Sequence, residues 1–195
     1  MYKADLGDVS LRVPEAKAIA NLLLKGVKKA EFLKKIQDEN ILHYTNIGRA
    51  KRHAFTIRSR LESVDKELWQ LAAEGDFATA TQATLVATLK RSSLLFDFFR
   101  LEIIPSVEAK VFELPRFHWK KYIDGCKLRD PEMPDWSPTT IKRMGSTLYK
   151  ILHEAEFVKN TRKPVLNRIL VTPEVLDYLT KQNEREILYL LTWKK

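Results

Sequence analysis

IGRAKRHAFTIRSRL, the stretch at residues 47–61, carries a repeat of apolar side chains with the period of an α-helix. Successive members of the repeat are 3, 4, 3 and 4 positions apart, so all of them fall on one helix face. They are Ile47, Ala50, Ala54, Ile57 and Leu61. The stretch therefore predicts an amphipathic helix that packs this face against a hydrophobic core.

The same stretch contains five cations and no acidic residue, so its charges cannot be neutralised within the helix. Arg49, Arg52 and Arg60 are expected on one outer stripe, with Lys51 and Arg58 flanking it. A concentrated basic face predicts contact with a polyanion such as nucleic acid. Two alternatives stay open: the charges only keep the helix soluble, or Arg58 or Arg60 pairs inside the protein.

Further helical repeats on both sides of this stretch predict a mainly α-helical protein. The other helices of the first half are expected at about residues 13–25, 28–37, 68–74, 77–89 and 92–104. Asp76 is placed to cap the helix that follows it, and Pro105 is expected to break or bend the most apolar one. Asp97 lies within that apolar run and needs a partner, for which an arginine of residues 47–61 is the candidate. Residues 1–113 are expected to form one helical bundle.

The second half has the order of elements that a winged helix-turn-helix module needs. A helix, a proline-rich loop, a second helix, a basic turn, a β-prone run and a last helix are expected at about residues 117–125, 130–136, 137–156, 159–164, 168–171 and 173–181. Ser137-Pro138 is a strong start for the second helix, because serine caps free amides and proline fits the first turn. Residues 114–195 are therefore predicted to form a winged-helix-like module with a small β-hairpin, in which Phe157-Val158 precedes the basic turn and the β-prone run 168–171 follows it.

The second helix of such a module lies in the major groove, so its outer side chains must be cations and small hydrogen-bond donors. The outer side of the helix expected at 137–156 meets this need with Lys142, Arg143, Ser146, Thr147 and Lys150. Arg162 and Lys163, in the expected wing turn, suit phosphate contacts, which position a protein on DNA without reading its bases. The competing interpretation is a charged helix face that is only solvated.

Composition favours a nucleic-acid partner and gives little support for an enzyme. The chain has 34 Lys and Arg against 25 Asp and Glu, a formal net charge of +9, which attracts nucleic acid or another anionic surface. The four histidines and the single cysteine have no metal-ligand spacing, and the scattered glycines form no phosphate-binding loop. We expect no catalytic residue, metal, cofactor or small-molecule substrate. The acidic cluster Asp130, Glu132 and Asp135 is interpreted as a helix-capping loop in preference to a nuclease metal site.

Two further features concern the compartment. The most apolar stretch, residues 92–104, includes charged side chains and is shorter than the roughly 20 residues that a bilayer requires, so no membrane partner is expected. Cys126 is the only cysteine and cannot form an internal disulfide, and no signal-peptide core follows the first residues. The expectation is a cytoplasmic protein.

Several short motifs occur in an order and spacing that is more specific than any one of them. They are Ala4-Asp5-Leu6, residues 15–24, Glu39-Asn40-Ile41-Leu42, residues 50–61, residues 94–98, Asp130-Pro131-Glu132, Trp136-Ser137 and residues 151–155. In this arrangement the chain resembles the BrxA family of BREX phage-exclusion systems over nearly its whole length.

The resemblance implies a small accessory protein of a bacterial antiphage defence system, with double-stranded DNA as its ligand. It also implies an amino-terminal helical bundle like the NusB antitermination fold. Since the visible cations suit phosphates better than base edges, weak sequence specificity is expected. Two other functions stay open: an adaptor that assembles other BREX proteins, and RNA binding, for which a NusB-like bundle with an arginine-rich helix is a known setting.

Overall fold

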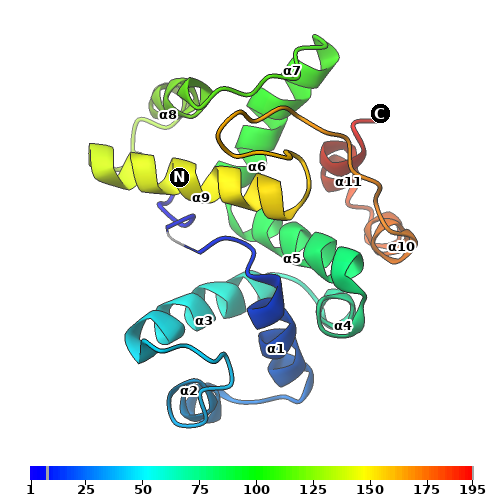
Figure 1. Ribbon diagram of the computed structural model, residues 1–195. Coiled ribbons are helices and arrows are strands. Elements are labelled where there is room, and N and C mark those ends of the chain that lie inside the picture. Colours follow the sequence, from blue (N-terminus) through cyan, green and yellow to red (C-terminus); the bar gives the residue numbers. More distant parts are fainter. Residues whose placement is uncertain (8, 195) are drawn as a thin grey trace. The chain divides into compact units, whose positions relative to one another are not determined.

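Helices make up most of the protein in the computed structural model, which describes residues 1–7 and 9–194 (Figure 1). The prediction of a mainly α-helical protein is confirmed. The chain divides into two compact units. Unit 1 consists of Met1–Ser10, Ser92–Val171 and Leu179–Lys195, and unit 2 of Leu11–Arg91 and Thr172–Tyr178.

This division differs from the predicted boundary at residue 113, which falls inside unit 1. The apolar helix that was expected at the centre of an amino-terminal bundle packs on the helix that follows it in the chain. The ring of Phe98 lies 6.0 Å from that of Trp119 and 5.2 Å from that of Tyr122. The Tyr122 hydroxyl also donates a 2.7 Å hydrogen bond to the backbone oxygen of Leu94. These contacts bury the apolar helix within unit 1.

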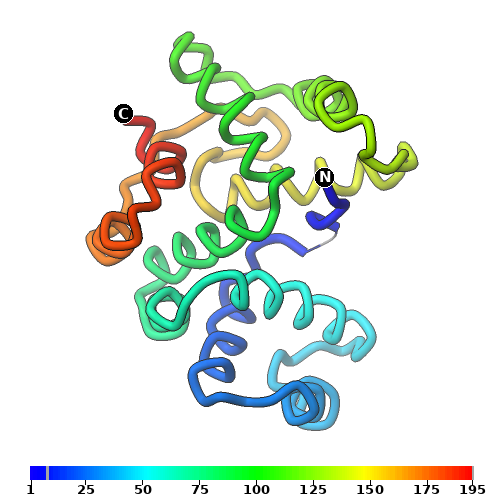
Figure 2. The backbone as a smooth tube through the Cα atoms, turned by 180° about the vertical axis from the view of Figure 1, so that it is seen from behind, coloured from blue at the N-terminus to red at the C-terminus, as the bar shows by residue number. Residues whose placement is uncertain are grey.

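Unit 2 contains five helices whose bounds agree with the predicted ones to within a few residues (Figure 2). They are α1 Val13–Leu24, α2 Lys29–Gln37, α3 Ile47–Leu61, α4 Lys66–Glu74 and α5 Phe77–Arg91. Contacts with α1, α3 and α4 bury α5, a helix rich in small side chains that allow close approach. The predicted cap is confirmed, because Asp76 Oδ1 accepts a 2.7 Å hydrogen bond from the backbone N–H of Thr79.

Unit 1 is built around a continuous helical segment and two longer helices. The segment comprises α6 Ser93–Phe98, the π-helical turn η1 Phe99–Ile103 and α7 Ile104–Glu108, and the longer helices are α8 Phe117–Arg129 and α9 Pro138–Glu154. Helix α10, Pro173–Lys181, was predicted and is present, with residues in both units. Helix α11, Arg185–Thr192, belongs to unit 1 and was not predicted.

Pro105 was expected either to break or to bend the apolar helix. It does not break it, because the helix does not end there. Its hydrogen bonding changes just before the proline, where the backbone N–H of Ile104 donates to the oxygen of Phe99, five positions earlier. A proline cannot donate to the oxygen four positions earlier, and its ring needs room beside that oxygen. The wider π-helical turn accommodates Pro105, and the segment continues to Glu108.

The predicted wing strand at 168–171 is wrong. These residues form no strand, and the pairing among the described residues is limited to two isolated antiparallel bridges, Glu113 with Val165 and Val158 with Leu166. Pro164 supplies an acceptor to Leu114 but has no N–H to donate. The segment at 165–166 is therefore paired over only one residue on each side. Val158 was predicted to belong to the wing, whereas Glu113 was not.

The partner predicted for Asp97 is also wrong. The Asp97 carboxylate accepts a 2.6 Å hydrogen bond from the Tyr2 hydroxyl and lies 2.8 Å from a guanidinium nitrogen of Arg100. Both partners belong to unit 1, and neither lies on α3. The carboxylate thus obtains its charge partner from its own helical segment, one turn away.

Candidate nucleic-acid interface

Helix α9 supplies the main group of predicted contact residues. It begins where the sequence indicated, because Ser137 Oγ accepts a 3.2 Å hydrogen bond from the backbone N–H of Thr140 and Pro138 takes the first helical position. Its apolar face is buried, including Met144, Leu148 and Ile151. The burial of this face directs the opposite face to solvent.

The solvent face of α9 carries Lys142, Arg143, Ser146 and Lys150, all exposed. Ser146 donates a 3.1 Å hydrogen bond to the backbone oxygen of Lys142, so its hydroxyl is held near the cations. None of the three cations forms an ion pair with an acid in the part of the chain that the structure describes. Their charges are therefore available to an external anion.

Thr147 was predicted to belong to this contact surface, and that prediction is wrong. Its side chain is 7% exposed, and its hydroxyl donates a 2.9 Å hydrogen bond to the backbone oxygen of Gly7. On a helical wheel Thr147 lies about 140° from Lys142, at the margin of the buried face. The residue anchors the amino-terminal segment of unit 1 to α9.

The turn at 159–164 presents the second group, Arg162 and Lys163, and both are exposed. The side-chain oxygen of Asn160 accepts hydrogen bonds from the backbone N–H groups of both cations, at 2.7 and 3.4 Å. Such a local bond shapes a turn without help from a strand ladder. The turn therefore keeps a defined form, although the segments that flank it are paired by an isolated antiparallel bridge, Val158 with Leu166, and not by a strand ladder.

Arg116 fastens this turn to α9. Its guanidinium donates two hydrogen bonds to the backbone oxygen of Thr161, at 3.2 and 3.1 Å, and lies over the ring of Tyr149, 5.1 Å from the centroid. Tyr149 is buried in α9 and donates to the oxygen of Pro115 at 3.0 Å, and burial raises its pKa to about 12. Arg116 and Asn160 were not among the predicted site residues; sequence offered no signal for a cation that bonds to a backbone oxygen.

The contact between α8 and α9 depends on a glycine. Trp119 of α8 donates a 2.7 Å hydrogen bond from its indole Nε1 to the backbone oxygen of Ile141 in α9. A Cβ atom added at Gly145 would lie only 2.5 Å from Trp119 Cδ1. The absence of a side chain at Gly145 thus allows the indole to lie close against α9, the helix that carries the basic face.

In unit 2, two of the five predicted α3 cations are not available as contacts. Arg60 is 3% exposed, which contradicts its predicted place on an outer stripe. Arg58 Nε donates a 2.7 Å hydrogen bond to Glu62 just after the helix, and its guanidinium lies over the ring of Phe32, 4.6 Å from the centroid. Arg58 is therefore committed to internal partners, as one alternative had it, although the partner is not Asp97.

The other three α3 cations lie near the beginning of the helix. Arg49 and Arg52 are exposed and Lys51 is half-buried. Arg52 donates a 3.3 Å hydrogen bond to the backbone oxygen of Gly48, and Asn46 caps the helix by accepting from the N–H of Arg49. These side chains form a smaller basic surface on unit 2.

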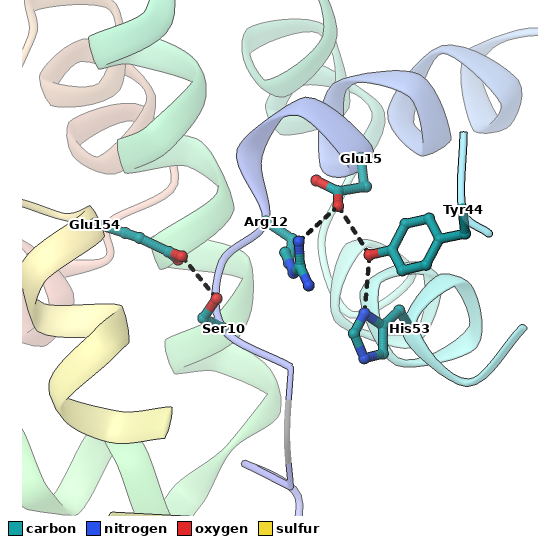
Figure 3. Close-up of polar contacts among 6 residues, drawn as sticks. All are labelled: Ser10, Arg12, Glu15, Tyr44, His53 and Glu154. Carbon is teal, nitrogen blue, oxygen red and sulfur yellow. Dashed lines mark hydrogen bonds and ion pairs between the residues drawn. The ribbon is translucent and has the colours of Figure 1, made fainter. Parts of the chain in front are cut away.

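A partly buried polar network joins α1 to α3 and to Tyr44, which precedes α3 (Figure 3). The Tyr44 hydroxyl donates to Glu15 Oε1 at 2.8 Å and lies 2.9 Å from His53 Nδ1, while Arg12 donates to the same Glu15 oxygen at 3.2 Å. Burial, and then the bond to Glu15, raise the pKa of Tyr44 to about 12. His53 therefore has a structural role.

Figure 3 also shows, within unit 1, the 2.7 Å hydrogen bond from Ser10 to Glu154.

The described residues show no cluster of three or more His, Cys, Asp or Glu side chains suited to a metal ion. In the acidic loop after α8, Asp130 accepts a hydrogen bond from the backbone N–H of Tyr2, and Asp135 pairs with Lys127, which lowers the pKa of that carboxyl. Cys126 is buried, and burial raises the pKa of its thiol. Within the described ranges, no helix combines the length and apolar character that a membrane crossing demands.

Comparison with known proteins gives consistent matches. The model of the BrxA family matches residues 1–183. A relative from Paramagnetospirillum magneticum, named BREX protein BrxA, is 36% identical over 189 residues, which cover 96% of this chain and 94% of the relative. A relative of the same name from Escherichia coli O9:H4 is 30% identical over 197 residues, covering 99% of this chain and 92% of the relative.

A solved structure matches as well. The crystal structure of an uncharacterized protein from Magnetospirillum magneticum has a TM-score of 0.90 and 35% sequence identity to this chain, over 99% of both chains. The helical architecture described above is therefore shared with an experimentally determined fold.

Proposed function

The chain belongs to the BrxA family, and on this basis we propose that it is a non-catalytic, DNA-binding accessory protein of a bacterial antiphage defence system. Double-stranded DNA would lie against α9 and the turn at 159–164 of unit 1. The observation that carries the proposal is the exposed row of unpaired cations on α9, to which Arg116 ties the turn with Arg162 and Lys163.

The dimensions of this surface suit a duplex. Lys142 and Lys150 are eight positions apart, which corresponds to about 12 Å, or about two turns, of cationic helix face. The major groove, about 12 Å wide, admits an α-helix. In the proposed arrangement α8 and α9 act as a helix-turn-helix pair, with α9 in the groove and the turn as a reduced wing on the phosphates. Helices α1–α5 would correspond to the NusB-like bundle.

The proposed contacts are mainly to phosphates, so sequence specificity is expected to be weak. Lysine and arginine side chains on an exposed helix reach phosphates readily, whereas the α9 face carries no Asn or Gln for bidentate contact with adenine. Arg143 is the side chain on this face best suited to guanine, and Ser146 can donate to either a base or a phosphate.

Salt dependence tests the proposal quantitatively. If Lys142, Arg143, Lys150, Arg162 and Lys163 each neutralise one phosphate, the slope of log K against log salt concentration is about −4.5. Raising the salt from about 50 to about 200 mM should then weaken duplex binding by about 500-fold. A flat salt response would contradict a phosphate-dominated interface.

The experiment is a fluorescence-anisotropy titration of a blunt DNA duplex at these two salt concentrations. One variant changes Lys142, Arg143 and Lys150 to alanine. The matched control changes Arg49, Lys51 and Arg52 to alanine, which removes the same number of charges from unit 2. We expect the α9 variant to bind more weakly at low salt and to lose only about 12-fold between the two salt concentrations, because two contacts remain. The control should keep the full slope.

Other outcomes would change the assignment. If the control variant loses the slope instead, the duplex binds α3. If the intact protein fails to bind duplex DNA even at low salt, the adaptor function becomes the better proposal, and co-purification of another BREX protein after nuclease treatment would support it. Metal-dependent DNA cleavage that persists through purification would contradict a non-catalytic role.

RNA binding is the second candidate, and the exposed Arg49 and Arg52 of unit 2 favour it, because DNA bound on α9 does not require them. Direct binding of labelled structured RNA to the intact protein, lost in the Arg49, Lys51 and Arg52 variant, would support this function. RNA binding that the same variant leaves unchanged would argue against an RNA site on α3.

A further inference from the structure

A groove of about 500 Å³ opens on the surface of unit 1, outside the proposed duplex interface. It lies between α7 and the segment after it, the segment at 165–168 and the residue that follows α11. Its walls include Val107, Phe112, Val165, Arg168 and Trp193. The volume falls within the range of small-molecule sites, and the lining is mainly apolar. None of the described residues that line the groove is acidic.

Large apolar side chains are unusually exposed around this groove. Phe112 is 42% exposed, Val165 50% and Leu170 89%. Scattered exposed apolar residues are ordinary on a protein surface, but Phe112 and Val165 line one groove, and Leu170 follows two residues after Arg168, which also lines it. The arrangement indicates a surface that a ligand covers.

Two polar side chains of the groove, Asn167 and Arg168, indicate the chemistry of its ligand. Trp193 lines the groove with a half-buried side chain, but its indole Nε1 is buried and out of reach of a ligand there. Arg168 is exposed and forms no ion pair within the described ranges. Asn167 donates from Nδ2 to the backbone oxygen of Glu156 at 3.3 Å, which leaves its side-chain oxygen as an acceptor. A matching ligand has a planar body, hydrogen-bonding groups at its edge and a negative charge.

The groove is continuous with the turn that carries the proposed phosphate contacts. Lys163 is followed by Pro164 and then by Val165, which lines the groove. Two residues span at most about 7 Å of chain. A phosphate on Lys163 would therefore hold the neighbouring nucleotide close to the groove.

We propose that the groove binds an unpaired base of a DNA strand whose phosphate lies on Arg162 and Lys163, with the base stacked on Phe112 and Trp193 and its own phosphate on Arg168. This inference rests on the proposed DNA-binding function and adds a preference for duplexes that carry a single-stranded tail. Aromatic walls stack on any base, so the preference does not depend on sequence. An acidic peptide would satisfy Arg168, but it would neither use the aromatic walls for stacking nor continue from the phosphate contacts.

The test compares a blunt duplex with the same duplex extended by a single-stranded tail of thymidines, at the 5′ or the 3′ end, in anisotropy titrations at one salt concentration. Stacking of one base is worth about 1–3 kcal/mol, which corresponds to an affinity gain of about 5- to 150-fold. The groove variant is Phe112→Ser. The matched control is Phe117→Ser, which removes another exposed phenylalanine, on α8 and outside the groove lining.

The expected result is an affinity gain from at least one tail in the intact protein and in Phe117→Ser, and no gain in Phe112→Ser. Arg168→Gln, at an exposed position, should also reduce the gain and serves as a second variant if Phe112→Ser fails to fold. Absence of any gain from either tail in the intact protein, or a gain that survives in both groove variants, would overturn the inference.

The two proposals can fail separately. Binding of blunt duplex without any gain from a tail leaves duplex binding intact and removes the groove proposal. Failure to bind blunt duplex, combined with Phe112-dependent binding of a single-stranded thymidine oligonucleotide, removes the duplex interface and retains the groove.

Discussion

Replacing Gly145 with alanine should destabilise unit 1, because this glycine lies against Trp119 where α8 contacts α9. A Cβ atom at position 145 would lie 2.5 Å from Trp119 Cδ1 and 2.7 Å from its Nε1, well inside the 3.4–4 Å of ordinary contacts. The indole would have to move by about 1 Å to restore carbon–carbon contact distances. Such a movement would stretch or break its hydrogen bond to the backbone oxygen of Ile141.

The size of the effect follows from three contributions. Overpacking of a core costs about 1–3 kcal/mol, and loss of a hydrogen bond about 0.5–1.5 kcal/mol. Alanine recovers about 0.8–1.0 kcal/mol through its higher helix propensity. With central values, Gly145→Ala should lower the free energy of unfolding by about 2 kcal/mol.

Urea denaturation followed by far-ultraviolet circular dichroism measures this change as a lower transition midpoint at unchanged slope. Gly125→Ala in α8 is the matched control, because the nearest atom to its added Cβ is a terminal nitrogen of Arg129 at 3.0 Å, at the end of a flexible side chain. That control should leave stability unchanged or raise it by up to about 1 kcal/mol.

A Gly145→Ala protein as stable as the wild type would refute the close contact between the indole and α9. A double-mutant cycle with Trp119→Leu adds a second test, since removal of the indole relieves the clash. The double variant should be more stable than the sum of the two single changes indicates, by at least about 1 kcal/mol. Additive effects would mean that Gly145 and Trp119 do not interact.

Three other variants test separate contacts. Arg116→Ala removes the hydrogen bonds to the Thr161 oxygen, so the turn at 159–164 should become more mobile and duplex binding should weaken. Amide hydrogen exchange at Thr161 to Lys163 should become faster, and unchanged exchange would contradict the anchoring role. Thr147→Val keeps the side-chain shape but leaves the Gly7 oxygen without its donor, so unfolding should become easier by about 1 kcal/mol, and an unaffected midpoint in urea would argue against the bond. Asp76→Ala should lower the melting temperature at neutral pH. The hydrogen bond from the Thr79 N–H lowers the pKa of Asp76 below 3.8. The higher stability of the wild type is therefore present above that pH and is lost as the pH falls through the lowered pKa. A stability difference that does not depend on pH would contradict the cap.

Helix positions could be predicted because their signals are local. A cap, a proline in the first turn and an apolar repeat set the bounds of α3 and the starts of α5 and α9 without information about distant residues. Helix α11 was missed although Ile187, Leu190 and Leu191 have helical spacing and are buried. The repeat there is short, and no capping side-chain bond marks its start.

The wing and the unit boundary depend on contacts between segments that are distant in the sequence, and local sequence patterns do not show which segments meet. The run at 168–171 has β-branched and apolar residues, but a strand also needs a neighbour with free N–H and C=O groups. The segment at 165–166 instead finds short partners at Glu113 and Val158. In the same way, the assignment of residues 92–108 to unit 1 follows from aromatic contacts with α8, across a sequence separation of about 20 residues.

The α3 cations show why charge alone did not locate the interface. Arg49 and Arg60 are 11 positions apart, which on an α-helix is three turns and about 20°, so both fall on one stripe. Arg49 is exposed, yet Arg60 is buried. A helical wheel gives the direction of a side chain but not which neighbour lies along that direction. The helix that neighbours α3 near its end is α5, whose Arg91 donates a 2.9 Å hydrogen bond to Ser59.

The same reasoning separates α9 from α3 as the proposed DNA-binding helix. A duplex groove contacts a helix over about two turns, so the cations must stay exposed over that whole length. On α9 they do, from Lys142 to Lys150, and only Thr147 at the edge of the stripe is covered. On α3 the exposed cations are confined to the first half, from Arg49 to Arg52. A stripe interrupted by a neighbouring helix can hold one or two phosphates, but it cannot lie along a groove, and this difference in continuous exposure is our reason for assigning duplex binding to α9.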